Sequence, residues 1–191
     1  MFPAFNDRST DIHSLLYYSK NAKEFQDDLI DNVLGCHVPM PAGDQKSTFQ
    51  YLVSDTLGDS CNFDTVKTLH ENLTEMIEEH KDEPEPLRLD KTDVKKLLER
   101  SGAKEEHLEQ FDREFEAAAG ETSSLLASNV ANTRTFEVKT PDVMIKVHPD
   151  RTDLVETRLI DGIPYLMIQL SDSVEVNGIP VTNKNMTPLE E

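Results

Sequence analysis

The spacing of apolar residues changes once along this chain, and that change most constrains the fold. Before Thr133 the apolar residues recur every three or four positions, as in Phe63, Val66, Leu69 and Leu73, which is typical of amphipathic helices. From Thr133 onward they alternate with polar residues, as in TRTFEVKTPDVMIKVHP, which is typical of strands. The sequence therefore predicts an α+β protein whose helices precede an antiparallel sheet.

The first part of the chain is predicted to form a hairpin followed by helices whose ends are marked by capping residues. Strands are expected over residues 2–5 and 12–18, on either side of a cluster of turn-forming residues. Three helices are then expected over residues 21–35, 44–58 and 62–80. Beyond them we expect a helical hairpin, with Asp90 capping its first helix and Gly120 ending its second.

Two dipeptides in the last third of the chain favour tight hairpin turns. Asp161-Gly162 separates LVETRLI from IPYLMIQL, and Asn177-Gly178 separates VEV from IPV. With the alternating segment before them, they predict an antiparallel meander of five or six strands that ends near Val181.

The run EEHKDEPEPL suggests a boundary, because Pro84 and Pro86 disfavour helix before them and the charges discourage burial. The predicted organisation is a hairpin and three-helix lobe over residues 1–83, a linker over 84–86, a helical hairpin with an antiparallel sheet over 87–183, and a tail over 184–191.

The charge balance is strongly acidic and argues against some classes of partner. Thirty-seven Asp and Glu face 19 Lys and Arg, for a net charge of -18, whereas nucleic-acid affinity comes largely from Lys and Arg. No apolar run approaches the ~18 residues of a membrane-spanning helix. Only two cysteines occur, and no apolar leader precedes Phe2, so a reducing, cytoplasmic setting is expected.

Several long segments resemble a bacterial protein family. FPAFNDRSTDIHSLLYYSKN, EEHKDEPEPL, LLASNVANTRTFEVKTPDV, RTDLVETRLIDG and EVNGI occur here in the order typical of the family catalogued as domain of unknown function number 4317. The resemblance implies a longer cytoplasmic protein of which this chain is the C-terminal portion. It implies no activity and no role for any residue.

A polar run near the start contains residue types suited to catalysis or ligand binding. Asp7, Arg8, Asp11 and His13 are candidates for proton transfer, or for binding a phosphorylated or other anionic small molecule. The alternative is that the run shapes a turn through bonds between side chains and backbone. We favour the turn, because no further residue at a diagnostic spacing completes a known site.

Other arrangements give weaker signals. Cys36, His37, Cys61 and His70 include zinc-ligand types, but only the first two are close, and they are direct neighbours rather than two to four residues apart. No phosphate-binding glycine loop and no Gly-x-Ser-x-Gly motif occurs. We therefore predict no metal and no cofactor.

Two functional hypotheses follow. The favoured one is a non-enzymatic protein-interaction or structural module, whose partner is another protein or a further N-terminal part of the same chain. The alternative is an enzyme or ligand-binding protein with its site at residues 7–13. The sequence predicts no nucleic-acid or membrane partner and leaves the oligomeric state open.

Overall fold

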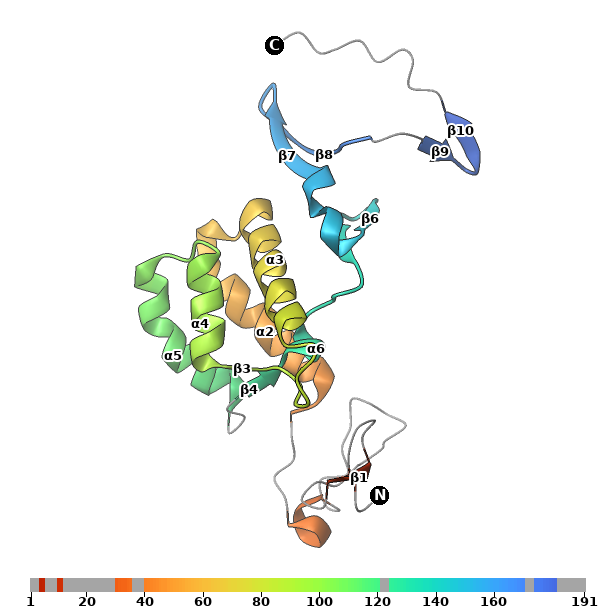
Figure 1. The fold of residues 1–191 in the computed structure, drawn as a ribbon. Helices are drawn as coiled ribbons and strands as arrows, with labels where there is room; N and C mark the ends of the chain where they lie inside the picture. Colours follow the sequence, from red (N-terminus) through yellow and green to blue (C-terminus); the bar gives the residue numbers. More distant parts are fainter. Residues whose placement is uncertain are drawn as a thin grey trace. The chain divides into compact units, whose positions relative to one another are not determined.

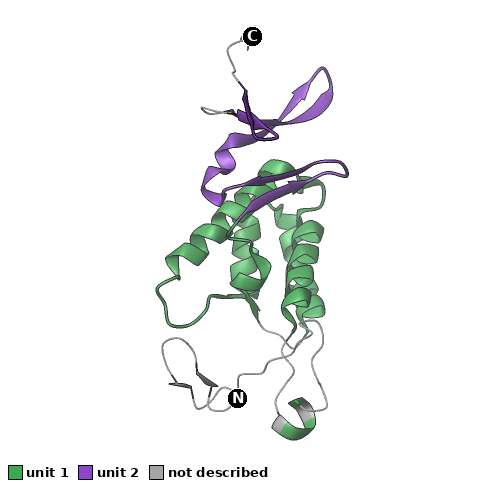
Figure 2. Cartoon of the chain, turned by 90° about the vertical axis from the view of Figure 1, so that its right-hand side faces the viewer, with its two compact units in different colours: residues 1–134 green, residues 135–191 purple. Residues whose placement is uncertain are grey.

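The computed structural model describes residues 4–5, 10–11, 30–35, 40–120, 124–170 and 174–181. The predicted α+β class is confirmed, with helices in the first part and antiparallel strand pairs in the last. The chain divides into two compact units, residues 1–134 and residues 135–191, shown in green and purple in Figure 2.

The N-terminal hairpin is present in the described backbone. Strand β1 (Ala4–Phe5) pairs antiparallel with β2 (Thr10–Asp11), so that Ala4 faces Asp11. The second strand thus lies inside the polar run, whereas the strand predicted over residues 12–18 lies outside the described residues. Of the helix predicted over residues 21–35, only the end is described, as a π-helical turn (Ile30–Leu34) before Gly35.

Several helix ends of the first unit lie where the sequence predicted them. Helix α2 (Ala42–Leu57) ends at Gly58, which has a positive φ of 47°. Helix α3 (Phe63–Glu79) begins where Asn62 accepts a bond from the Thr65 amide. The other helical segments of this unit are the 3-10 turn η2 (Gly58–Ser60), α4 (Lys91–Arg100), α5 (Glu105–Ala119) and α6 (Ala127–Val130).

A two-stranded sheet that the sequence did not predict joins distant parts of this unit. Strand β3 (Arg88–Asp90) pairs antiparallel with β4 (Ser124–Leu126), and the buried Leu89 and Leu125 face each other. Asp90 then caps α4, with its side chain accepting from the Asp93 amide at 2.8 Å. In Figure 1 this sheet lies at one end of the helices α2 to α5.

One hydrophobic core fills the helical part of the first unit. It combines buried side chains from before residues 84–86, such as Leu52 and Leu57, with others from after them, such as Leu97, Leu98 and Phe111. The predicted linker is therefore a turn within one compact unit, and the division between units falls at residues 134 and 135 instead. The prolines lie between α3, which ends at Glu79, and α4, which begins at Lys91, but helices on both sides share the same core.

The second unit confirms the predicted antiparallel meander as three consecutive hairpins. Its strands are β5 (Phe136–Lys139), β6 (Met144–Val147), β7 (Val155–Ile160), β8 (Ile163–Ile168), β9 (Val174–Val176) and β10 (Ile179–Val181), with the 3-10 segment η3 (Pro149–Leu154) before β7. Asp161 and Asn177 both adopt positive φ values of 51°, as tight hairpin turns require. Within the described residues, no ladder of hydrogen bonds joins one hairpin to the next.

Candidate interaction surface

The polar run singled out in the sequence falls largely beyond what the structure describes. Asp7, Arg8 and His13 lie outside the described residues, and for Asp11 only the backbone in β2 is described. Their convergence into one site therefore stays a prediction.

The candidate metal ligands are likewise only partly described. Cys36 and His37 lie outside the described residues, whereas Cys61 is an exposed free thiol after η2. Across the described ranges, no three His, Cys, Asp or Glu side chains gather in a way that could hold a metal ion.

Two histidines of the first unit bond to backbone carbonyls at helix ends. The Nδ1 of His107 donates to the Thr56 carbonyl at 2.8 Å, which ties α5 to the end of α2. The Nδ1 of His80 donates to the Met76 carbonyl at 2.8 Å in the last turn of α3, where carbonyls lack partners within the helix. Both rings therefore have structural contacts.

A cleft of about 320 Å³ lies between α4 and α5. Its lining mixes both signs of charge with one leucine: Thr92, Lys95, Lys96, Glu99, Glu105, Leu108 and Glu109. The Nζ of Lys95 lies 3.3 Å from a carboxylate oxygen of Asp112, so this cation is already paired. The cleft lining contains no histidine or cysteine and offers no pairing of a nucleophile with a base.

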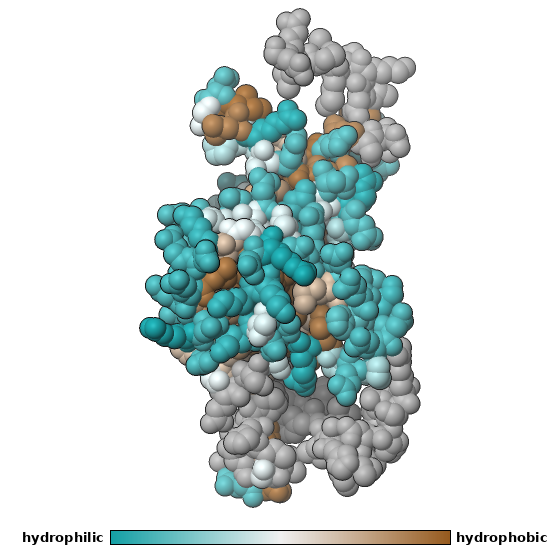
Figure 3. Space-filling model, turned by 60° about the vertical axis from the view of Figure 1, so that its left-hand side comes forward, coloured by the Kyte–Doolittle hydropathy of each residue, from teal (hydrophilic) through white to brown (hydrophobic). Residues whose placement is uncertain are grey.

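Exposed apolar side chains concentrate in the second unit. Leu159 and Ile179 are 74% and 68% exposed, and nine further large apolar residues between Val143 and Val181 are also exposed. Figure 3 shows apolar side chains in brown on the hairpins, while the helical surface in this view is mainly teal. Contiguous exposed apolar surface commonly marks an interaction site.

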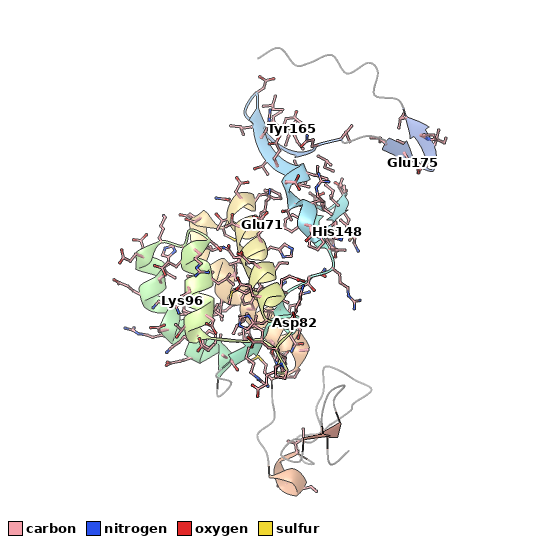
Figure 4. The ribbon with its side chains drawn as sticks, in the orientation of Figure 1. Glu71, Asp82, Lys96, His148, Tyr165 and Glu175 are labelled. Atoms are coloured by element: carbon pink, nitrogen blue, oxygen red, sulfur yellow. The ribbon has the colours of Figure 1, made fainter. Side chains whose placement is uncertain are left out.

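The pairing of β7 with β8 sorts their side chains onto two faces. Because Val155 faces Ile168 and Leu159 faces Pro164, one face carries Val155, Thr157, Leu159, Pro164, Leu166 and Ile168. We call these six residues the uncharged face. Val155 is buried, but Leu159 and Ile168 are exposed. Tyr165, labelled in Figure 4, belongs to the opposite face.

That opposite face holds the charges of the hairpin. It carries Glu156, Arg158, Ile160, Ile163, Tyr165 and Met167. The Nε of Arg158 lies 2.9 Å from a carboxylate oxygen of Glu156, so the two charges neutralise each other locally. The uncharged face therefore carries no charged side chain from its own hairpin.

The neighbouring hairpins show the same sorting with different coverage. In β9 and β10, Val174, Val176, Ile179 and Val181 share one face, and the last three are exposed. In β5 and β6, the corresponding apolar face is covered more fully, because Phe136 is buried and its neighbours on that face are partly buried. Lys146 pairs with Glu137 at 3.3 Å on the other face.

Sequence reasoning identified these strands and their turns but not their exposed apolar faces. The alternation of VETRLI was visible, yet alternation alone predicts a covered apolar face. Two cations of these strands, Lys146 and Arg158, form ion pairs within their own hairpins.

Comparison with known proteins gives a family but no function. The family model described as Domain of unknown function (DUF4317) matches residues 1–179. The match covers most of the chain and is not confined to a C-terminal portion. No curated protein and no solved structure matches the chain. Among the described residues, no helix has the length and apolar character needed to cross a membrane.

Proposed function

We propose that this chain, which belongs to the DUF4317 family, is a non-enzymatic protein-interaction module. The observation that carries this proposal is the uncharged face of the β7–β8 hairpin, on which Leu159 and Ile168 are exposed. A two-stranded hairpin is marginally stable in water unless another layer covers its apolar face. A protein partner would supply that layer.

The difference between the two units in how far their apolar side chains are buried supports this proposal. The first unit has a well-packed core and an acidic exterior, which favours solubility. The second unit has few buried side chains of its own and exposes apolar residues on all three of its hairpins. The partner is another protein or a further part of a longer chain. The exposed thiol of Cys61 suits a reducing, cytoplasmic setting.

The test compares affinity capture by the chain and by a variant carrying Leu159→Ser and Ile168→Ser. We expect the captured protein to be lost with this variant, and we expect its addition to slow hydrogen exchange in β7 and β8 of the unaltered chain. A control variant with Glu137→Gln and Lys146→Gln changes two side chains of the β5–β6 hairpin and should leave capture intact. Equal capture by all three proteins would overturn the proposal.

The alternative, a ligand site at Asp7, Arg8, Asp11 and His13, stays a prediction. Thermal unfolding against a panel of phosphorylated metabolites tests it, because a ligand at one hundred times its Kd stabilises the folded state by about 2.7 kcal/mol. Loss of that shift in an Asp7→Ala, Arg8→Ala variant would support the ligand site.

A further inference from the structure

The β7–β8 hairpin has two outer edges, and the backbone bonds identify which groups point outward. The Gln169 amide donates to the Leu154 carbonyl at 2.8 Å, so these two residues form a hydrogen-bonded pair at the start of the hairpin. Such pairs alternate along an antiparallel ladder. Glu156, Arg158 and Ile160 therefore direct their backbone groups toward β8, whereas Val155, Thr157 and Leu159 direct theirs to the outer edge of β7.

The outer edge of β8 is blocked, whereas that of β7 can accept another strand. Pro164 pairs with Leu159, at a position whose backbone groups point outward, and proline has no amide hydrogen to offer there. Prolines at such positions are a common defence against pairing along an edge. On β7 the Val155 amide bonds to the Thr152 carbonyl, but no strand of the described chain pairs with this edge at Thr157 and Leu159.

The order of side chains along β7 is complementary to itself. Around Thr157, a negative charge at Glu156 is matched by a positive charge at Arg158, and an apolar Val155 by an apolar Leu159. An antiparallel pairing of two β7 strands centred on Thr157 would place each Glu156 opposite the other copy's Arg158. It would also place each Val155 opposite the other copy's Leu159. Opposite charges directly across an antiparallel pair are stabilising, and like charges are destabilising.

We propose that two copies of this chain associate through β7, with the two strands antiparallel about Thr157, to form a four-stranded sheet in the order β8–β7–β7–β8. The backbone can supply four bonds: two between the Thr157 residues, and one from each Leu159 amide to the other copy's Val155 carbonyl. The pairing is isologous and closes on itself, since Pro164 prevents growth at the outer edges. The proposal goes beyond the proposed function, because it uses the backbone edge of β7 and leaves the uncharged face available to another protein.

The edge of β9 provides a contrast within the same unit. Its two-residue turn makes Val176 and Ile179 a hydrogen-bonded pair, so the backbone groups of Glu175 point outward. Self-pairing centred on Glu175 would bring two like charges opposite each other. The charge order that allows self-pairing therefore belongs to β7 and not to β9.

Charge reversal tests the pairing by analytical ultracentrifugation of the full chain over a range of concentrations. The unaltered chain should reach twice its monomer mass, and Arg158→Glu or Glu156→Arg alone should raise the dimer Kd by roughly tenfold or more. An equimolar mixture of these two variants should restore association, because each supplies the charges that the other lacks. The double variant Glu156→Arg, Arg158→Glu should also associate. Lys146→Glu changes the net charge by the same amount as Arg158→Glu and should have no effect.

A backbone variant provides an independent test. Thr157→Pro removes an amide hydrogen that points away from β8, so it should abolish the dimer while preserving the hairpin. Unchanged far-ultraviolet circular dichroism would verify that the chain still folds. A wild-type chain that stays monomeric at millimolar concentration would overturn the proposal, as would a charge-reversed mixture that fails to associate.

The outcomes separate this proposal from the broader one. If the chain is monomeric but the Leu159→Ser, Ile168→Ser variant loses a captured protein, self-pairing fails and the interaction function stands. If a dimer forms that these two substitutions abolish but charge reversal does not change, the association uses the uncharged face and pairing of β7 edges is wrong. If no variant changes any association, both proposals fail.

Discussion

The two units of this chain handle their apolar residues in opposite ways. In the helical part of the first unit, Leu52, Leu57, Leu98 and Phe111 are essentially inaccessible to water and belong to one core. In the second unit, Leu159 lies on a regular, well-paired strand and is largely exposed. A segment can therefore form a regular strand without burying its apolar face. The first unit buries its apolar side chains in its own core, whereas the second leaves many of them exposed.

The largest expected difference between the units is in the response to truncation of an aromatic ring. Phe111→Ala removes a fully buried ring from the helical core and should lower the free energy of unfolding by about 3–5 kcal/mol. Tyr165→Ala makes a comparable change on the exposed β8 strand and should have a much smaller effect. Urea unfolding followed by circular dichroism measures both. Equal losses would contradict the view that only the first unit depends on its own core.

A buried polar side chain should give the next largest effect. The Oε1 of Gln45 accepts bonds from the Leu126 amide at 2.9 Å and from Asn129 Nδ2 at 3.1 Å, while its Nε2 donates to the Met40 carbonyl at 2.8 Å. Gln45→Leu leaves these groups without that partner and should destabilise the chain by about 1–3 kcal/mol.

The control for this prediction is Gln50→Leu, an exposed position on the same helix. It should change the urea midpoint little. If Gln45→Leu were equally neutral, the bonds between α2 and the segment around β4 would not contribute to the stability of the first unit.

The contrast between local and distant contacts also explains what the sequence could predict. The helix start near Asn62, the cap at Asp90 and the turn at Asp161 depend on neighbouring residues, and all three were predicted. Gln45 contacts Leu126, 81 positions away, and no local pattern reports such a contact. The pairing of β3 with β4 was missed for the same reason, because a three-residue strand is too short to show a period.

The same reasoning applies to the domain boundary and to the candidate surface. Pro84 interrupts the helical pattern, but whether such a break separates domains depends on packing between distant helices. The alternation in β7 indicated a strand with two distinct faces, whereas the coverage of those faces depends on contacts with distant parts of the molecule. A sequence pattern therefore specifies an interaction surface less well than it specifies a turn or a cap.

The pH dependence of stability tests a smaller feature of the first unit. Burial lowers the pKa of His70, and the charge of Glu71 offsets part of that effect. As the pH falls through about 6.5, this histidine therefore takes up a proton in the unfolded chain before it does so in the folded chain. The stability that neutral His70 contributes is thus present above that pH and decreases as the pH falls toward the pKa of the folded state.

Urea unfolding at pH 7.5, 6.5 and 5.5 should therefore show a decline that is shallower in the His70→Gln variant. The slope is the relevant readout, because the substitution also alters packing at every pH. His148→Gln, at an exposed histidine of the second unit, should retain the full decline. Identical slopes in all three proteins would show that burial of His70 does not affect stability.

The smallest expected effect is that of Leu159→Ala, and it can be compared with the same substitution in the core of the first unit. Leu98→Ala removes a fully buried side chain and should destabilise the chain by about 2–5 kcal/mol, whereas Leu159→Ala should stay within about 0.5 kcal/mol at concentrations where the chain is monomeric. The substitutions are chemically identical, so the difference isolates burial from residue type. A loss of several kcal/mol from Leu159→Ala in the monomer would mean that the chain itself covers this side chain, and that the β7–β8 hairpin is not available to a partner.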